Sequence, residues 1–154
     1  MRLITRRKSS SLLLPAICGM LCLSGAAAQA DVRKLAASSR TAESITGNIE
    51  ISPSAIKMSK ATFKVRVAGQ NPHYATSFGT QVPATIYQVT TPQNPELING
   101  NKVCSQNVRW FALYEPEPGQ GNSADNVCLS AFEGDAKPSG DNTPGLCGYY
   151  CYSE

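Results

Sequence analysis

The acidic residues best placed to do chemistry bracket a loop rich in glycine and proline. Glu115, Glu117 and Asp125 are the acidic residues of the stretch EPEPGQGNSADN. Such carboxylates could supply the acid and base pair of a glycan hydrolase, or bind a hard cation such as calcium. Their spacing matches no calcium-binding loop, and Pro116 and Pro118 instead favour a stiff, solvated excursion. We keep the three acids as candidate ligand contacts and assign no metal.

Two further patterns could indicate catalysis. His73, the only histidine, stands in NPHYATS and could act as a general base or a metal ligand, but the sequence places no partner beside it. Ser54 to Lys57, SAIK, has the S-x-x-K form of serine–lysine acyl enzymes, yet the segment alternates like a strand and no K-T-G follows. We predict no catalytic residue and no cofactor, and keep His73 as a candidate surface contact.

Aromatic side chains cluster in two segments of the C-terminal half. Trp110 and Tyr114 lie in VRWFALY, and Tyr149, Tyr150 and Tyr152 lie in LCGYYCYS. Rings on an exposed sheet face could stack on a glycan or anchor a protein partner. We expect most of these rings to fill the core, and keep Tyr149 and Tyr152 as candidate contacts at the surface.

Residues 1–30 have the organisation of a secretory signal peptide. A basic segment, MRLITRRK, precedes the apolar stretch LLLPAICGMLCLSG, and Ala28 and Ala30 form an A-x-A cleavage site. The apolar stretch is shorter than the roughly 20 residues of a membrane span. We expect cleavage after Ala30 and a bacterial protein that is periplasmic or secreted. The twin-arginine pattern is incomplete, and the choice of export route stays open.

Removing this leader changes the charge balance. The whole chain carries 14 basic and 11 acidic residues, and four of the basic residues but none of the acids lie in the leader, which leaves about −1 for residues 31–154. This balance excludes the clustered basic surface that nucleic acids and anionic membranes require. We expect no nucleic-acid partner and no membrane span after cleavage. We expect a monomer.

Short alternating segments predict an all-β fold for residues 44–154. Residues 31–43 are expected to form a flexible arm and residues 69–83 a loop. The remaining segments predict six or seven short strands in a small antiparallel sandwich or barrel, since no apolar period of helical length occurs. Val108 to Tyr114 is apolar on both faces, which is typical of a strand covered on both sides.

Four cysteines follow the leader, and an even number in an exported chain favours two disulfides. If LCGYYC is a strand, Cys147 and Cys151 are about 13 Å apart and cannot bond each other. A hairpin closed by residues 134–145, with Glu133 opposite Leu146, places Cys128 opposite Cys151. Cys104 then remains for Cys147. The same register predicts a core face of Val127, Leu129, Ala131, Gly148, Tyr150 and Tyr152.

These observations favour a non-catalytic binding or inhibitory module of the cell envelope, because long loops on a cross-linked scaffold are where binding residues tend to lie. The partner would be an envelope protein or a glycan. A cell-wall glycan hydrolase using the loop carboxylates is one alternative. A structural envelope protein that assembles through a sheet edge is the other.

Overall fold

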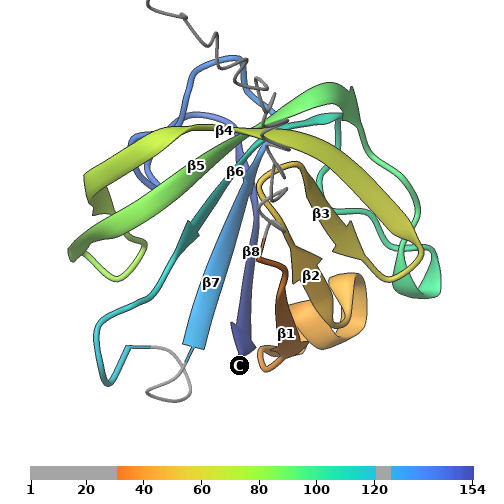
Figure 1. Ribbon diagram of the computed structural model, residues 1–154, viewed down its shortest axis with the longest axis horizontal. Helices are drawn as coiled ribbons and strands as arrows, with labels where there is room; N and C mark the ends of the chain where they lie inside the picture. The colour runs from red at the N-terminus through yellow and green to blue at the C-terminus, as the bar shows by residue number, and fades with distance from the viewer. Residues whose placement is uncertain (1–30, 121–125) are drawn as a thin grey trace, which may run out of the picture.

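The computed structural model describes residues 31–120 and 126–154, which form one closed antiparallel β-barrel (Figure 1). The leader and Asp125 lie outside the described residues. The barrel has eight strands: β1 Arg33–Ala37, β2 Ile49–Ile51, β3 Ala55–Met58, β4 Ala61–Ala75, β5 Gln81–Gln93, β6 Val108–Tyr114, β7 Asn126–Phe132 and β8 Leu146–Ser153. Two short helical turns, η1 (Ala42–Thr46) and η2 (Ile98–Gly100), lie in the connections. The all-β prediction is confirmed, but the fold is an eight-stranded barrel and not a sandwich of six or seven strands.

Each strand pairs with its neighbours in the chain, and β1 closes the barrel against β8 through Ala36 opposite Ser153. The prediction that residues 31–43 form a flexible arm is wrong for this reason. Arg33–Ala37 is a strand with neighbours on both sides, and Leu35 is buried in the core. The strand pattern in the sequence is weak here because β1 is short and only one of its side chains is large, apolar and inward-facing.

The β4–β5 hairpin is much longer than the sequence predicts. Residues 69–83 were expected to form a loop, yet β4 continues to Ala75 and β5 begins at Gln81. Irregularities in the pairing between Val67 and Gly69 and between Asn71 and Tyr74 account for the error. A bulge absorbs residues such as Pro72 that cannot donate to a regular ladder, so turn-like residues occur inside a bent strand.

The barrel interior is filled by apolar side chains. Phe63 and Phe111 meet edge to face at its centre, with ring centroids 5.2 Å apart. The register places Val127, Leu129 and Ala131 opposite Tyr152, Tyr150 and Gly148, and this predicted core face is confirmed. Eight strands enclose a space that side chains can fill, so this barrel has a packed core along most of its length.

A second apolar cluster lies on the outer face of β4–β8. It contains, among others, Tyr74, Ile86, Tyr114, Cys128 and Phe132. The connection between β7 and β8, residues 133–145, covers this face, with Asp141 donating its backbone N–H to the carbonyl of Ala75. Both faces of β6 are apolar because one face lines the barrel interior and the other contacts this loop.

Both predicted disulfides are present, Cys104–Cys147 and Cys128–Cys151. The predicted pairing holds from Asn126 to Ala131, but beyond it a bulge places Phe132, and not Glu133, opposite Leu146. Two disulfides indicate an oxidising, extracellular compartment. Across the residues described, none of the helical segments has the length and apolar character of a membrane span.

Candidate functional site

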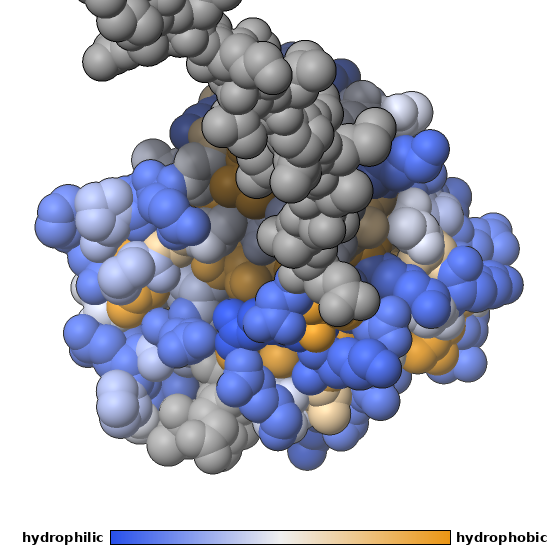
Figure 2. All heavy atoms as spheres, viewed as in Figure 1, coloured by the Kyte–Doolittle hydropathy of each residue, from blue (hydrophilic) through white to orange (hydrophobic). Residues whose placement is uncertain are grey.

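One end of the barrel is open because its strands differ in length. The β3 strand begins at Ala55, opposite Lys64, and the last backbone contact between the two strands is the N–H of Val65 with the carbonyl of Ser54. The β4 strand continues for ten further residues without β3 beside it. Val67, which faces inward with Tyr87 and Phe111, is therefore 44% exposed. In Figure 2, apolar surface is visible in a hollowed area bordered by hydrophilic residues.

The hollow at this end has a volume of about 510 Å³. Its inner wall is one layer of the barrel, formed by Gln70, Thr85 and Leu113, which lie opposite one another on β4, β5 and β6. Tyr87 and Phe111 form the next layer of the barrel inward from this wall. The other lining residues are Arg33, Val82, Pro83, Tyr114, Glu115, Pro116, Glu117 and Pro118. We call these residues together the open-end hollow.

Arg33 crosses the open end from β1. It shares a face with Leu35, so its side chain begins on the interior side, and its guanidinium donates to Glu154 and, at 3.2 Å, to Glu115. Partial burial acts to lower the pKa of Arg33, but the hydrogen bonds and charges of Glu154 and Glu115 outweigh it, and the net pKa is raised. Arg33 is thus a permanent cation whose charge is already compensated.

Known protein families, curated sequences and solved structures show no match to this chain. The function therefore has to be argued from the geometry of the chain itself.

The open-end hollow brings two of the predicted contacts together. Glu115 and Glu117 both line it and both are exposed to solvent, Glu115 in the ion pair with Arg33. The third predicted acid, Asp125, is one of the positions that the structure does not describe. The sequence did not single out Arg33, Gln70 or Thr85, because only the barrel register makes them inward-facing.

The other predicted contacts lie elsewhere. His73 is exposed on β4, and its backbone N–H donates to Asn71 Oδ1. Tyr149 is half-buried on the outer face, where its hydroxyl donates to Cys128 Sγ. Tyr152 is 0% exposed, and its hydroxyl lies 2.8 Å from Thr46 Oγ1 inside the barrel. Tyr152 as a surface contact is therefore wrong, because its position in β8 faces the core.

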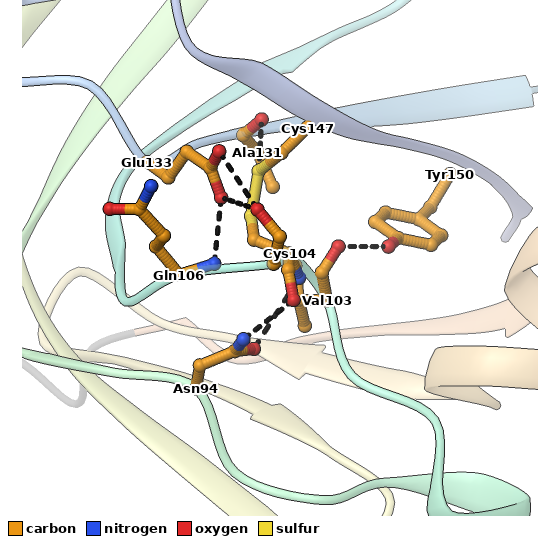
Figure 3. Close-up of a disulfide and its surroundings, with 9 residues drawn as sticks. Asn94, Val103, Cys104, Gln106, Ala131, Glu133, Cys147 and Tyr150 are labelled. Carbon is orange, nitrogen blue, oxygen red and sulfur yellow. Dashed lines mark hydrogen bonds between the residues drawn. A yellow bond between two sulfur atoms is a disulfide. The ribbon is translucent and has the colours of Figure 1, made fainter.

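The sulfur atoms of Cys104 and Cys147 lie beside the carboxylate of Glu133 (Figure 3). Within the described part of the chain this is the one group of three metal-ligating side chains whose ligand atoms are within 4.8 Å of one another. The sulfurs are bonded to each other and so supply no thiolate ligand. Glu133 accepts hydrogen bonds from Ser105 Oγ and the Gln106 N–H, which anchor the 94–107 loop to the end of β7, while the disulfide anchors it to the start of β8.

The 133–145 loop contains a buried carboxylate, that of Asp141, which the sequence did not indicate. Asp141 is 6% exposed and accepts five hydrogen bonds. Oδ1 accepts from the Tyr74 and Ser130 hydroxyls, both at 2.6 Å, and Oδ2 accepts from the Tyr114 hydroxyl and from the N–H and hydroxyl of Ser77, each at 2.8 Å. Every donor is neutral, so hydrogen bonds alone stabilise the buried charge.

The Asp141 network is structural. Burial, followed by the hydrogen bond and charge of Asp141, raises the pKa of Tyr74, and burial together with the Asp141 charge raises that of Tyr114. Both phenols therefore stay protonated and donating. No oxygen of Asp141 is left to act on a substrate, and the network instead fixes the loop to the outer face of the barrel.

Proposed function

We propose that this chain is an exported, non-catalytic binding module and that its ligand enters the open-end hollow. The observation that carries the proposal is the hollow itself, because a pocket at the mouth of a barrel, with apolar walls and a few polar groups, is a common form of ligand site. The signal-peptide organisation of residues 1–30 and the two disulfides support export to an oxidising space, the periplasm or the medium.

The two disulfides and the Asp141 network support binding by a preformed surface. They join the 94–107 and 133–145 loops and β8 to the barrel, so these parts need little ordering when a ligand enters. The hydrolase alternative has weaker support. Glu115 and Glu117 are both exposed, and a glycosidase acid needs an apolar surrounding that keeps it protonated. The sheet-edge alternative is also weaker, because the sheet closes through β1 and β8.

The proposal can be tested by methyl NMR of the purified protein. The probes are the methyl groups of Thr85 and Leu113 in the hollow, with Leu146, at the start of β8, as the internal reference. The protein is titrated in turn with blocked basic, acidic and neutral peptides and with cell-wall oligosaccharides. We expect one class to shift the hollow signals in a saturable way while Leu146 stays unchanged, with no cleavage of any compound.

Two variants make the test specific. Gln70→Trp fills the hollow from β4 and should abolish the shifts, whereas Gln106→Trp introduces the same side chain at an exposed loop position and should leave them intact. Signals that stay unchanged with every class, or shifts that survive Gln70→Trp, contradict a binding site at this end. Release of reducing sugar ends during the titration would favour the hydrolase instead.

A further inference from the structure

We propose that the open-end hollow receives the side chain of a lysine or arginine presented by a partner protein. The inference rests on the proposed binding function and names the partner's chemistry. It draws on three features of the hollow: its charge, its apolar walls and the polar groups that have no partner within residues 31–120 and 126–154.

The charge around the hollow favours a cation. Two carboxylates, those of Glu115 and Glu117, line the hollow together with a single guanidinium, that of Arg33, and Glu154 also pairs with Arg33. Arg33 is held between Glu115 and Glu154, so its charge is compensated before any ligand arrives. An anionic ligand would have to displace one of these carboxylates from Arg33 and lie beside Glu117 as well. A cationic ligand meets Glu117 with no such displacement.

The walls of the hollow match the aliphatic part of a basic side chain. Leu113 and the rings of Pro83, Pro116 and Pro118 line it beside the carboxylates. Lysine and arginine combine an apolar stem of three or four carbons with a charged head, and they bury the stem along apolar surface while the head keeps polar contacts. A sugar or a small anion has no comparable apolar segment. A side chain projecting from a partner also leaves its own backbone outside the hollow.

The polar groups in and under the hollow that make no hydrogen bond among the described residues are placed for such a head. Glu117 lines the hollow, and its carboxylate has no ion-pair or hydrogen-bond partner in the described chain. Tyr87 lies one layer below the wall, two residues along β5 from Thr85 on the same inward face, and is 7% exposed. Its hydroxyl likewise has no hydrogen-bond partner among the described residues, and it interacts electrostatically with Arg33, which lines the hollow. Glu117 thus offers acceptor oxygens in the hollow, and Tyr87 offers one in the layer beneath it.

The test uses three blocked tripeptides that differ only at the central position: acetyl-Gly-Arg-Gly-amide, the same peptide with citrulline, and the same peptide with glutamate. Citrulline keeps the shape of arginine and removes its charge. The readout is the shift of the Leu113 methyl signals in the complete protein. We expect the arginine peptide to bind up to about fivefold more tightly than the citrulline peptide, since one exposed to partly buried ion pair contributes up to about 1 kcal/mol.

Matched variants locate the effect. Glu117→Gln should weaken the arginine peptide by about the same fivefold and leave the citrulline peptide unchanged. Glu96→Gln makes the same charge change at an exposed position of the 94–107 loop, at the other end of the barrel, and should change neither. Tyr87→Phe removes only the hydroxyl in the layer beneath the hollow and should weaken the arginine peptide without loss of fold.

The outcomes separate the two proposals. Equal binding of the arginine and citrulline peptides, or preference for the glutamate peptide, overturns the cation proposal while the hollow remains a binding site. Binding of a cell-wall oligosaccharide in place of all three peptides has the same meaning. No shift of the hollow signals with any compound overturns both the cation proposal and the proposed function.

Discussion

The substitution Asp141→Asn should detach the 133–145 loop and cost a large part of the stability of the chain. The amide can replace either carboxylate oxygen, and the better orientation keeps the three bonds of Oδ2 and loses the two bonds of Oδ1. Hydrogen bonds to a charged group contribute about 1.5–3 kcal/mol each, and rotated hydroxyls recover about 1 kcal/mol each by accepting from the new amide. We expect a net loss of about 1–4 kcal/mol.

The single tryptophan makes this loss measurable in two ways. Trp110 donates its indole N–H to the carbonyl of Asp135, within the same loop, so its fluorescence reports detachment of the loop. Urea unfolding followed by far-ultraviolet circular dichroism reports the whole barrel. In the variant we expect the fluorescence change to begin at lower urea concentration than the dichroism change, because the loop is lost before the barrel.

Asp135→Asn is the matched control. It makes the same chemical change in the same loop, but the Asp135 side chain is 90% exposed and forms only a surface ion pair with Arg109. We expect this control to change the free energy of unfolding by less than about 0.5 kcal/mol. If Asp141→Asn behaves like Asp135→Asn, the buried carboxylate does not hold the loop, and our account of the outer face is wrong.

Three further predictions concern the barrel. Burial raises the pKa of all six tyrosines, to about 12 for Tyr149 and Tyr150, so absorbance at 295 nm should show little phenolate in the native protein at pH 10. Because these folded-state pKa values lie above the unfolded value of 10, the contribution of the tyrosines to stability should be constant below about pH 10 and fall as the pH rises from 10 to 12; half-ionised native phenols at pH 10 would contradict this. Replacing Cys128 and Cys151 by alanine should lower the free energy of unfolding in urea by about 3.4 kcal/mol, as expected for a separation of 23 residues. Replacing Cys104 and Cys147 should lower it by about 4 kcal/mol, because their separation is 43 residues. The reverse order would count against the chain-entropy account. Gly148→Ala should cost about 1–3 kcal/mol, since a Cβ there would lie 2.6 Å from the Tyr150 ring, and an unchanged urea midpoint would show that the ring can move.

The pairing of β7 with β8 could be predicted from the sequence because two constraints coincide there. The cysteine spacing excludes a bond between Cys147 and Cys151, and alternation places Leu129 and Tyr150 on one face. A strand period of two residues then leaves a single register that satisfies both. The shift at Phe132 could not be predicted, because a bulge depends on how the following loop packs and not on the alternation before it.

The open-end hollow and the Asp141 network could not be predicted for a different reason. Both depend on contacts between segments far apart in the chain. Arg33 meets Glu115 only because β1 closes the barrel, and Asp141 meets Tyr74 only because the 133–145 loop folds back over β4. A carboxylate within a loop rich in glycine and proline has the local pattern of a solvated residue. The sequence singled out Glu115 and Glu117 because proline flanks them on a loop. It did not indicate Arg33, the cation beside Glu115.

Closure of the barrel by its last strand constrains how the chain matures as it emerges N-terminus first. Ala36 can pair with its β8 partner only after 117 further residues have emerged, so one edge of β1 stays unpaired until then. Each disulfide also has one sulfur in β8, and until that strand is made, Cys104 and Cys128 have, among the described residues, only each other as oxidation partners. Oxidation before β8 is available therefore favours a non-native cross-link between them, and productive maturation requires either slow oxidation or an isomerase.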